Sequence, residues 1–353
     1  MGIAPSVALE IRPSAAADDG ERDRFVLAHP RGSPFHLAGW RRAVERAHGH
    51  EPRDLIARRG GDLAGVLPLM RCGGPPFASP DLVSVPYGVY GGPIADSPEV
   101  GRALAAAAAD LGQQERAGRV ELRCVEDPGA EGFVGSDLYA TFVKELPADV
   151  ALVRRHMPKR ARAEVRHAIE KHGLDLEEGA RFLGDLARLF GESKRRLGSP
   201  GLPQAWFEAL ARELGPVAVC HAAVRRGEVV AATMSFVLRG TLTFYYIGTT
   251  AEANRTFRAT NFLTTRLQEW AVERGLRRFD LSRSRVGSGS YDFKVNQGLA
   301  ATPLAYRYAL IAKHGLPAMT PSNPRTRILR ETWAKLPGWL ARPLSDRLAR
   351  YLP

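Results

Sequence analysis

The sequence is poor in cysteine, and this excludes several classes of protein. Its 353 residues include only Cys72, Cys124 and Cys220, with no C-x-x-C pair and no Cys/His spacing typical of zinc. A disulfide-stapled fold is therefore excluded, and the sequence predicts a protein of a reduced, intracellular compartment without a bound metal.

Long apolar runs are also missing. No stretch approaches 18 consecutive apolar residues, so no membrane-spanning helix is predicted. The G-x-S-x-G signature of triad hydrolases is absent, and so is any nucleic-acid-binding motif. Positive charge is abundant instead, with a net charge of +12 that favours an anionic partner. Residues 321–353 alone carry seven basic and two acidic side chains.

The chain repeats one order of predicted elements. Each copy has an amphipathic helix with a tryptophan (Trp40 or Trp206), a β-hairpin at an Arg-Arg-Gly turn, a tyrosine-rich strand, a second helix and another strand. The hairpins read "DLIARRGGDLAGVLPLM" at 54–70 and "CHAAVRRGEVVAATMSFVL" at 220–238. This order predicts two similar α/β domains with mixed sheets.

The repeated order resembles the GNAT acyltransferase fold, and two copies joined by a basic helix resemble the FemAB family. The most specific stretches are "FYYIGTT", "NFLTTRLQEWAVERGLRRFDLSRS", "GSYDFKVNQG" and "PLAYRYAL". In the first half, "FHLAGW" and "YGVYGGP" resemble a FemAB-related subgroup associated with bacterial exopolysaccharide and exosortase (PEP-CTERM) systems. The resemblance implies GNAT-like domains at 1–150 and 176–312, a linker helix at 151–175 and a tail at 313–353.

The stretch "DLSRSRVGSGSYDFKVNQG", residues 280–298, contains the main catalytic candidate. We expect Phe293 to anchor this loop in the core, which would fix the adjacent Lys294. A fixed cation can stabilise the oxyanion formed when an amine attacks an ester or thioester, and the FemAB resemblance implies this role for Lys294. The alternative is that Lys294 caps a turn or pairs with Asp280 or Asp292.

Other candidate residues surround this stretch or lie on neighbouring elements. Tyr246 is a second catalytic candidate because only one of the adjacent Tyr245 and Tyr246 can face the core side of a strand. Further candidate substrate contacts are polar or aromatic side chains at strand ends and on the linker helix: Asp280, Ser282, Arg283, Arg285, Phe293, Tyr90, Lys159 and Arg162. Asp280 and Arg283 could instead pair with each other. On the linker helix, Ala161, Val165, Ala168 and Ile169 share one predicted inner face, so the helix's charges could be a solvated outer face.

The acyl donor stays open between two classes. Residues 249–266, "TTAEANRTFRATNFLTTR", contain no glycine. In this they differ from the glycine-containing loop that the resemblance to CoA-binding GNAT proteins would imply. Arg255, Arg258 and a helix N-terminus near Thr260 could still hold a phosphate. FemAB-type enzymes use aminoacyl-tRNA, so the sequence predicts aminoacyl-tRNA or acyl-CoA as donor and no tightly bound cofactor.

Three functions follow from these observations. The first is FemAB-like transfer of an acyl or aminoacyl group to an amine of an anionic envelope precursor or lipid-linked substrate. The others are CoA-dependent N-acetylation of a small-molecule or sugar amine, and non-catalytic binding during envelope assembly. We expect a cytoplasmic protein. Its basic tail either packs on the second domain or contacts the anionic inner face of the membrane.

Overall fold

The structure is a computed structural model that describes residues 8–74, 78–316 and 324–352. The chain divides into two compact units. Unit 1 comprises residues 1–137 and 304–316, and unit 2 comprises residues 138–303 and 317–352. Among the residues described, no helix combines the length and the apolar character needed to cross a bilayer.

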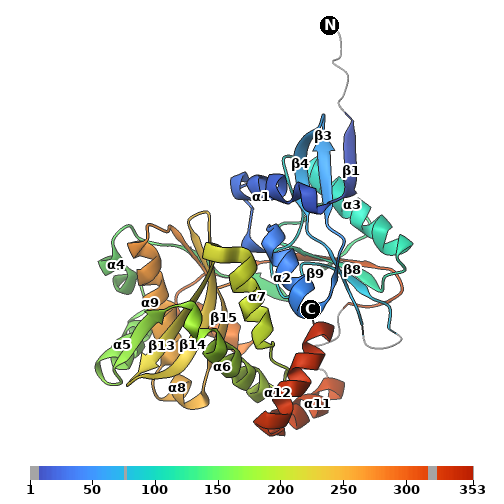
Figure 1. Cartoon of the computed structure of the whole chain (residues 1–353). Coiled ribbons are helices and arrows are strands. Elements are labelled where there is room, and N and C mark those ends of the chain that lie inside the picture. Colours follow the sequence, from blue (N-terminus) through green and yellow to red (C-terminus); the bar gives the residue numbers. More distant parts are fainter. Residues whose placement is uncertain (1–7, 75–77, 317–323, 353) are drawn as a thin grey trace. The chain divides into compact units, whose positions relative to one another are not determined.

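Unit 1 contains two sheets (Figure 1). One has the strand order β1-β3-β4-β7, and the other has the order β2-β5-β6-β8-β19-β9, in which β6 and β8 are parallel. Its elements are β1 (Leu9–Pro13), η1 (Ala16–Asp18), α1 (Asp19–Ala28), η2 (Pro34–His36), α2 (Ala38–His48), β2 (Glu51–Pro52), β3 (Leu55–Arg59), β4 (Asp62–Leu67), β5 (Met70–Cys72), β6 (Asp81–Ser84), β7 (Ile94–Ala95), α3 (Pro98–Gln114), β8 (Arg119–Cys124), β9 (Val134–Ser136) and β19 (Ala305–Leu310).

Unit 2 is built on a six-stranded sheet of order β11-β16-β15-β14-β13-β12, in which β15 and β16 are parallel, with a small β17-β10-β18 sheet beside it. Its elements are β10 (Tyr139–Thr141), β11 (Val143–Glu145), α4 (Val150–Arg155), α5 (Lys159–Glu170), β12 (Leu174–Glu178), η3 (Ala180–Phe182), α6 (Leu183–Arg196), α7 (Gln204–Leu214), η4 (Gly215–Val217), β13 (Ala218–Arg225), β14 (Glu228–Leu238), β15 (Thr241–Thr249), α8 (Ala251–Arg255), α9 (Ala259–Glu273), β16 (Arg278–Asp280), β17 (Ser284–Arg285), α10 (Gly289–Asn296), β18 (Thr302–Pro303), α11 (Pro324–Lys335), α12 (Gly338–Leu348) and η5 (Ala349–Tyr351).

Both predicted hairpins are present. The β3–β4 hairpin closes through residues 60–61 and the β13–β14 hairpin through residues 226–227. All four loop residues have positive φ, as a type I′ turn requires. Gly227, at φ 81°, adopts this conformation without steric cost.

The predicted five-element repeat is confirmed. The order helix, hairpin, strand, helix, strand is α2, β3–β4, β6, α3, β8 in unit 1 and α7, β13–β14, β15, α9, β16 in unit 2. In each unit the last two strands of the repeat are parallel neighbours. The copies differ at Pro68, which separates β4 from β5 because proline cannot donate a ladder hydrogen bond. Strand β14 of unit 2 runs unbroken.

Two predicted boundaries differ from the observed division. Strand β19 was expected in the second domain, but it pairs with β8 and β9 of unit 1. The chain therefore returns to unit 1 after β18, a long-range pairing that local sequence does not reveal. The expected linker helix, observed as α5, packs against α9 and belongs to unit 2.

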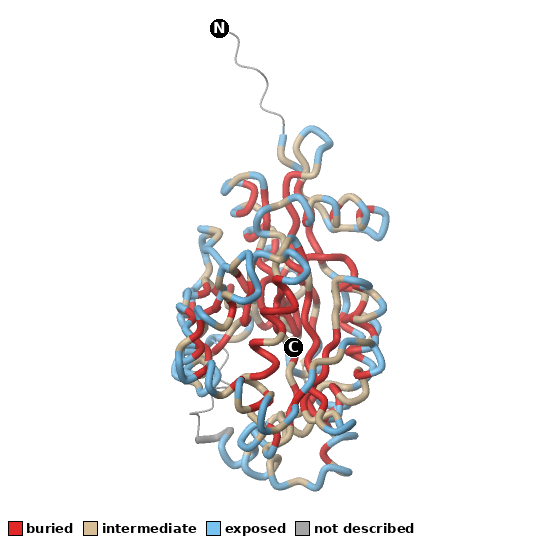
Figure 2. The backbone as a smooth tube through the Cα atoms, turned by 90° about the vertical axis from the view of Figure 1, so that its left-hand side faces the viewer, coloured by how far each residue is buried: buried red, intermediate tan, exposed pale blue. Residues whose placement is uncertain are grey.

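The core of unit 2 lies on both faces of its large sheet. On one face, Phe262 and Leu267 of α9 pack with Phe244 and Phe279 of the strands. On the other face, α6 and α7 contribute large buried side chains, including Trp206. Buried backbone in Figure 2 follows the strands and the helix sides that face them.

Candidate active site

The candidate site begins where strands β15 and β16 separate. Their parallel pairing covers only residues 241–243 and 278–280. The chain then turns at Ser282, whose φ is 59°. The N–H of Ser282 donates to Asp280 Oδ1 at 2.7 Å, and its hydroxyl donates to the Phe244 carbonyl at 3.0 Å. The turn is therefore tied to both strands.

Lys294 of α10 is buried against this turn. Its Nζ donates to the carbonyl oxygens of Ser282 at 2.9 Å and Arg283 at 3.2 Å. The same Nζ lies 5.2 Å from the ring centroid of Phe142. The side chain is only 8% exposed. Lys294 is thus fixed in position, and the two carbonyl contacts match the turn-capping alternative.

The prediction that Phe293 anchors the 280–298 stretch in the core is wrong. Residues 289–296 form helix α10, started by Ser288, whose hydroxyl accepts the Tyr291 N–H at 3.3 Å. Tyr291 packs edge-on against Phe142, with ring centroids 5.2 Å apart. Positions three apart on a helix share a face, so Tyr291 and Lys294 point inward together. Phe293 is only half-buried and is not among the side chains of the α9-side core, against which Tyr291 packs.

Burial changes the acid–base chemistry of Lys294. It lowers the pKa of the ammonium group from 10.5 to about 7, with Arg283 acting in the same direction and Asp280 opposing. Desolvation disfavours the charged form of an amine, which explains the direction. Near neutral pH the side chain can therefore be an ammonium donor or a neutral amine.

Two further cations belong to the same region. Arg283 stacks over the ring of Tyr139 at 4.3 Å. Lys194, in the last turn of α6, has its pKa lowered by burial and by the charge of Arg283. Sequence reasoning missed Lys194, because its "ESKRRLG" context is typical of a solvated helix end. Arg285 is half-buried on β17, opposite Tyr139 of β10.

Tyr246 does not join this group. The register of β14 and β15 shifts by one residue there, which leaves Tyr245 as a bulge. Phe244 packs in the α9-side core, whereas Tyr246 packs against Phe207 at 5.3 Å on the α7 side. Its hydroxyl accepts the indole N–H of Trp206 at 3.0 Å. Tyr246 is a packed core residue, so its predicted place beside Lys294 is wrong.

The remaining predicted substrate contacts lie on elements other than the Ser282 turn. Tyr90 belongs to unit 1, where it is buried and packs edge-on against Phe35 at 5.8 Å. Lys159 and Arg162 are exposed on α5. The predicted inner stripe of this helix is confirmed by Ala161, Val165 and Ala168, all of them buried.

The predicted donor contacts do lie together at the start of α9. Arg258 precedes the helix with its Nε 2.6 Å from Glu164 Oε2, and its Nη1 donates to the Arg255 carbonyl. The Thr260 hydroxyl donates to Asn254 Oδ1 at 2.5 Å. The short helix α8 occupies the connection that would hold glycines in a CoA-binding loop. Arg255 is the exposed cation of this group.

The described residues form no cluster of metal ligands. Across the described ranges 8–74, 78–316 and 324–352, no three His, Cys, Asp or Glu side chains gather as a metal site requires. His48 and His50 both stack on Tyr87 of unit 1.

Comparison with known proteins identifies the architecture. Residues 153–295 match the family model described as an acetyltransferase (GNAT) domain. The structure resembles FemX with a TM-score of 0.62 at 13% identity, covering 91% of this chain and 100% of that one. It also resembles a tandem GNAT protein from the clavulanic acid biosynthesis pathway (0.52, 16% identity, 86% and 98% covered). The fold is a tandem GNAT fold.

A third solved structure has the same GNAT architecture. It is the C-terminal domain of a putative lysylphosphatidylglycerol synthetase from Agrobacterium fabrum (TM-score 0.54, 12% identity, 84% and 93% covered). No curated protein matches this sequence. The residues that match the GNAT domain model include the Ser282 turn and Lys294.

Proposed function

We propose that this protein is a FemAB-like acyltransferase that transfers an acyl or aminoacyl group to an amine of a cell-envelope or exopolysaccharide-related precursor. The observation that carries the proposal is Lys294, which is buried, fixed by two carbonyls and included in the matched GNAT domain. The fold likenesses to FemX and to part of a putative lysylphosphatidylglycerol synthetase support it. The reaction takes place in the cytoplasm, where activated acyl donors are made.

The proposed reaction is an aminolysis. The neutral acceptor amine attacks the donor carbonyl, the new C–N bond forms and the C–O or C–S bond to the donor breaks. The amine loses one proton to solvent, and the departing oxygen or sulfur takes one up from solvent. The ammonium form of Lys294 stabilises the oxyanion of the tetrahedral intermediate. Arg283 and Lys194 supply positive charge for an anionic acceptor, and Arg285, Lys159 and Arg162 extend the predicted contacts.

In this proposal the acyl donor binds at the N-terminal end of α9. Arg255 and the first turn of this helix offer a cation and backbone N–H groups to a phosphate. The glycine-free connection through α8 favours an aminoacyl-tRNA over acyl-CoA. Thermal shift with CoA, acyl-CoA and aminoacyl-tRNA tests this assignment. A ligand at 100 times its Kd stabilises by about 2.7 kcal/mol, and stabilisation by CoA alone would reverse the choice.

Substitution of Lys294 tests catalysis. Loss of one oxyanion stabiliser costs about 10²–10³ in rate, so Lys294→Met should lower kcat by that factor. Lys171→Met, at an exposed lysine of the same unit, is the matched control and should keep full activity. If the Met variant folds and retains wild-type turnover, Lys294 is a structural turn residue and the proposed oxyanion role is wrong.

The pH profile distinguishes the two forms of Lys294. If the ammonium acts, the rate should fall as pH rises through about 7, the pKa of this group. Lys294→Arg should then move the falling limb to higher pH, because guanidinium stays charged. A rate that only rises through pH 7 would assign a general-base role to the neutral amine instead.

A further inference from the structure

The carboxyl-terminal helices α11 and α12 are attached to α6 of unit 2. Arg195 Nη1 donates to the carbonyl oxygens of Ala334 at 3.2 Å and Leu336 at 3.0 Å. The Ser345 hydroxyl accepts the Gly201 N–H at 3.2 Å. These contacts fix the connection between the two helices and give α12 a defined inner face.

The inner face is lined by small side chains. Ala341, Ser345 and Ala349 are buried and recur at intervals of four, which places them on one stripe of the helix. Three large apolar side chains are exposed, two on α11 and one on α12: Ile328 is 68% exposed, Leu329 71% and Trp339 77%. Trp333, Leu336, Leu340 and Leu344 are partly buried. Ordinary surface helices bury their large apolar residues, so the exposure of Ile328, Leu329 and Trp339 departs from that rule. An outer face of this kind is expected to have a partner.

The net charge of α11 and α12 indicates which kind of partner this surface would bind. Over residues 327–352 there are six basic and two acidic side chains, a net charge of +4. The basic residues are Arg327, Arg330, Lys335, Arg342, Arg347 and Arg350. Exposed tryptophan and aliphatic side chains among cations are typical of a helix that lies at a membrane surface. A nucleic acid would use the cations but not the isoleucine and leucine.

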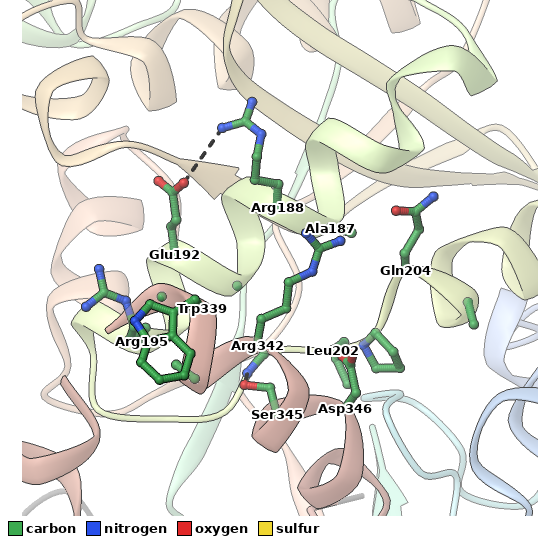
Figure 3. Close-up of a pocket in the computed structure, with 16 residues that line it drawn as sticks. Ala187, Arg188, Glu192, Arg195, Leu202, Gln204, Trp339, Arg342, Ser345 and Asp346 are labelled. Carbon is green, nitrogen blue, oxygen red and sulfur yellow. Dashed lines mark hydrogen bonds and ion pairs between the residues drawn. The ribbon is translucent and has the colours of Figure 1, made fainter. Parts of the chain in front are cut away.

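A pocket opens beside Trp339. It has a volume of about 460 Å³ and lies between α6, residues 201–205 and α12. Figure 3 shows Arg342 and Gln204 among its lining side chains, with Trp339 at the α12 side. A lipid headgroup would find hydrogen-bond donors in this pocket, next to the exposed side chain of Trp339.

We propose that α11 and α12 dock this protein onto an anionic phospholipid membrane. Ile328, Leu329 and Trp339 enter the headgroup region, and the surrounding arginines contact lipid phosphates. The inference comes from the surface of unit 2 and holds whether or not the proposed reaction is correct. It would place unit 2 at the membrane, where a lipid-carried acceptor is available.

Vesicle flotation of the full-length protein tests the proposal. We expect binding to vesicles of phosphatidylglycerol and phosphatidylcholine at low salt, much weaker binding at 0.5 M salt, and little binding to pure phosphatidylcholine. Trp339→Ala should weaken binding about ten-fold or more, because a large buried apolar surface is lost. Arg347→Gln and Arg350→Gln should each weaken it about five-fold.

Controls separate docking from folding. Leu27→Ala removes a half-exposed leucine of unit 1 and should leave vesicle binding unchanged. Each variant must keep the wild-type melting temperature. The proposal is overturned if the folded protein ignores anionic vesicles at low salt, if Trp339→Ala binds as well as wild type, or if RNA is retained while vesicles are not.

Discussion

Replacing Lys294 with methionine should change how the stability of the protein depends on pH. The folded-state pKa of Lys294 is about 7, against 10.5 for an unperturbed lysine. Between these values the unfolded chain binds one proton more than the folded chain. The free energy of unfolding therefore rises with pH in this window, by up to about 1.36 kcal/mol per pH unit.

The expected magnitude follows from the two pKa values. Below pH 7 the folded state holds a buried ammonium group, so the desolvation cost of this charge to the folded state is largest there. Integrated from pH 6 to pH 9, the contribution of Lys294 to the free energy of unfolding increases by about 2–3 kcal/mol. Lys294→Met abolishes this contribution. The difference in stability, wild type minus variant, should therefore rise by about 2–3 kcal/mol over that interval.

Urea denaturation of both proteins at pH 6, 7, 8 and 9 measures this difference. All other titrating groups are common to the two chains, so their contributions cancel. Lys171→Met is exposed and should show no such trend. Methionine also leaves the carbonyls of Ser282 and Arg283 without their donor, which costs about 1–3 kcal/mol each at every pH. A difference that stays constant from pH 6 to pH 9 would refute the lowered pKa.

Three further predictions test the packing of unit 2. Tyr246→Phe should lower the free energy of unfolding by about 1–3 kcal/mol in chemical denaturation, since the Trp206 N–H loses its acceptor, while activity changes little. Gly248→Ala should cost about 1–3 kcal/mol, because its Cβ would lie 2.3 Å from a backbone nitrogen of α6. Gly191→Ala, with no atom within 4 Å of the added Cβ, is the matched control and should be neutral or stabilising. Arg195→Ala should release the α11–α12 connection, and limited proteolysis should then cut near residue 335 faster than in wild type; unchanged cleavage would mean that other contacts hold the tail.

The sequence predicted those features that depend on local patterns. The Arg-Arg-Gly segments specify two-residue turns, and the inner stripe of α5 follows from its helical period. Tyr246 was misplaced because a one-residue bulge reverses which face a strand residue occupies, and no sequence signal marks the bulge at Tyr245. Strand β19 was misplaced because its partner β8 lies far away in the chain.

Helix α10 shows a different limit. Its glycine- and serine-rich approach, "SRVGSGS", is typical of a loop. Ser288 nevertheless starts the helix by accepting the Tyr291 N–H. The sequence therefore predicted a fixed Lys294 but misassigned the reason for it, because the lysine itself, rather than Phe293, is the buried residue.

The turn-holding and catalytic roles of Lys294 are compatible in chemical terms. An ammonium has three N–H donors, and two of them are directed at the carbonyls of Ser282 and Arg283. In the reaction proposed above, the third donor would serve the developing oxyanion. In the neutral amine both N–H bonds can serve the same carbonyls, and a lone pair takes the third position. The two carbonyls therefore orient the nitrogen in either state, while a pKa of about 7 decides whether that third position donates or accepts a proton. A lysine that only held the turn would need neither a third hydrogen-bonding position nor a pKa near neutrality. If Lys294 acts as proposed, the pH profile of catalysis and the pH dependence of stability should therefore report the same pKa of about 7.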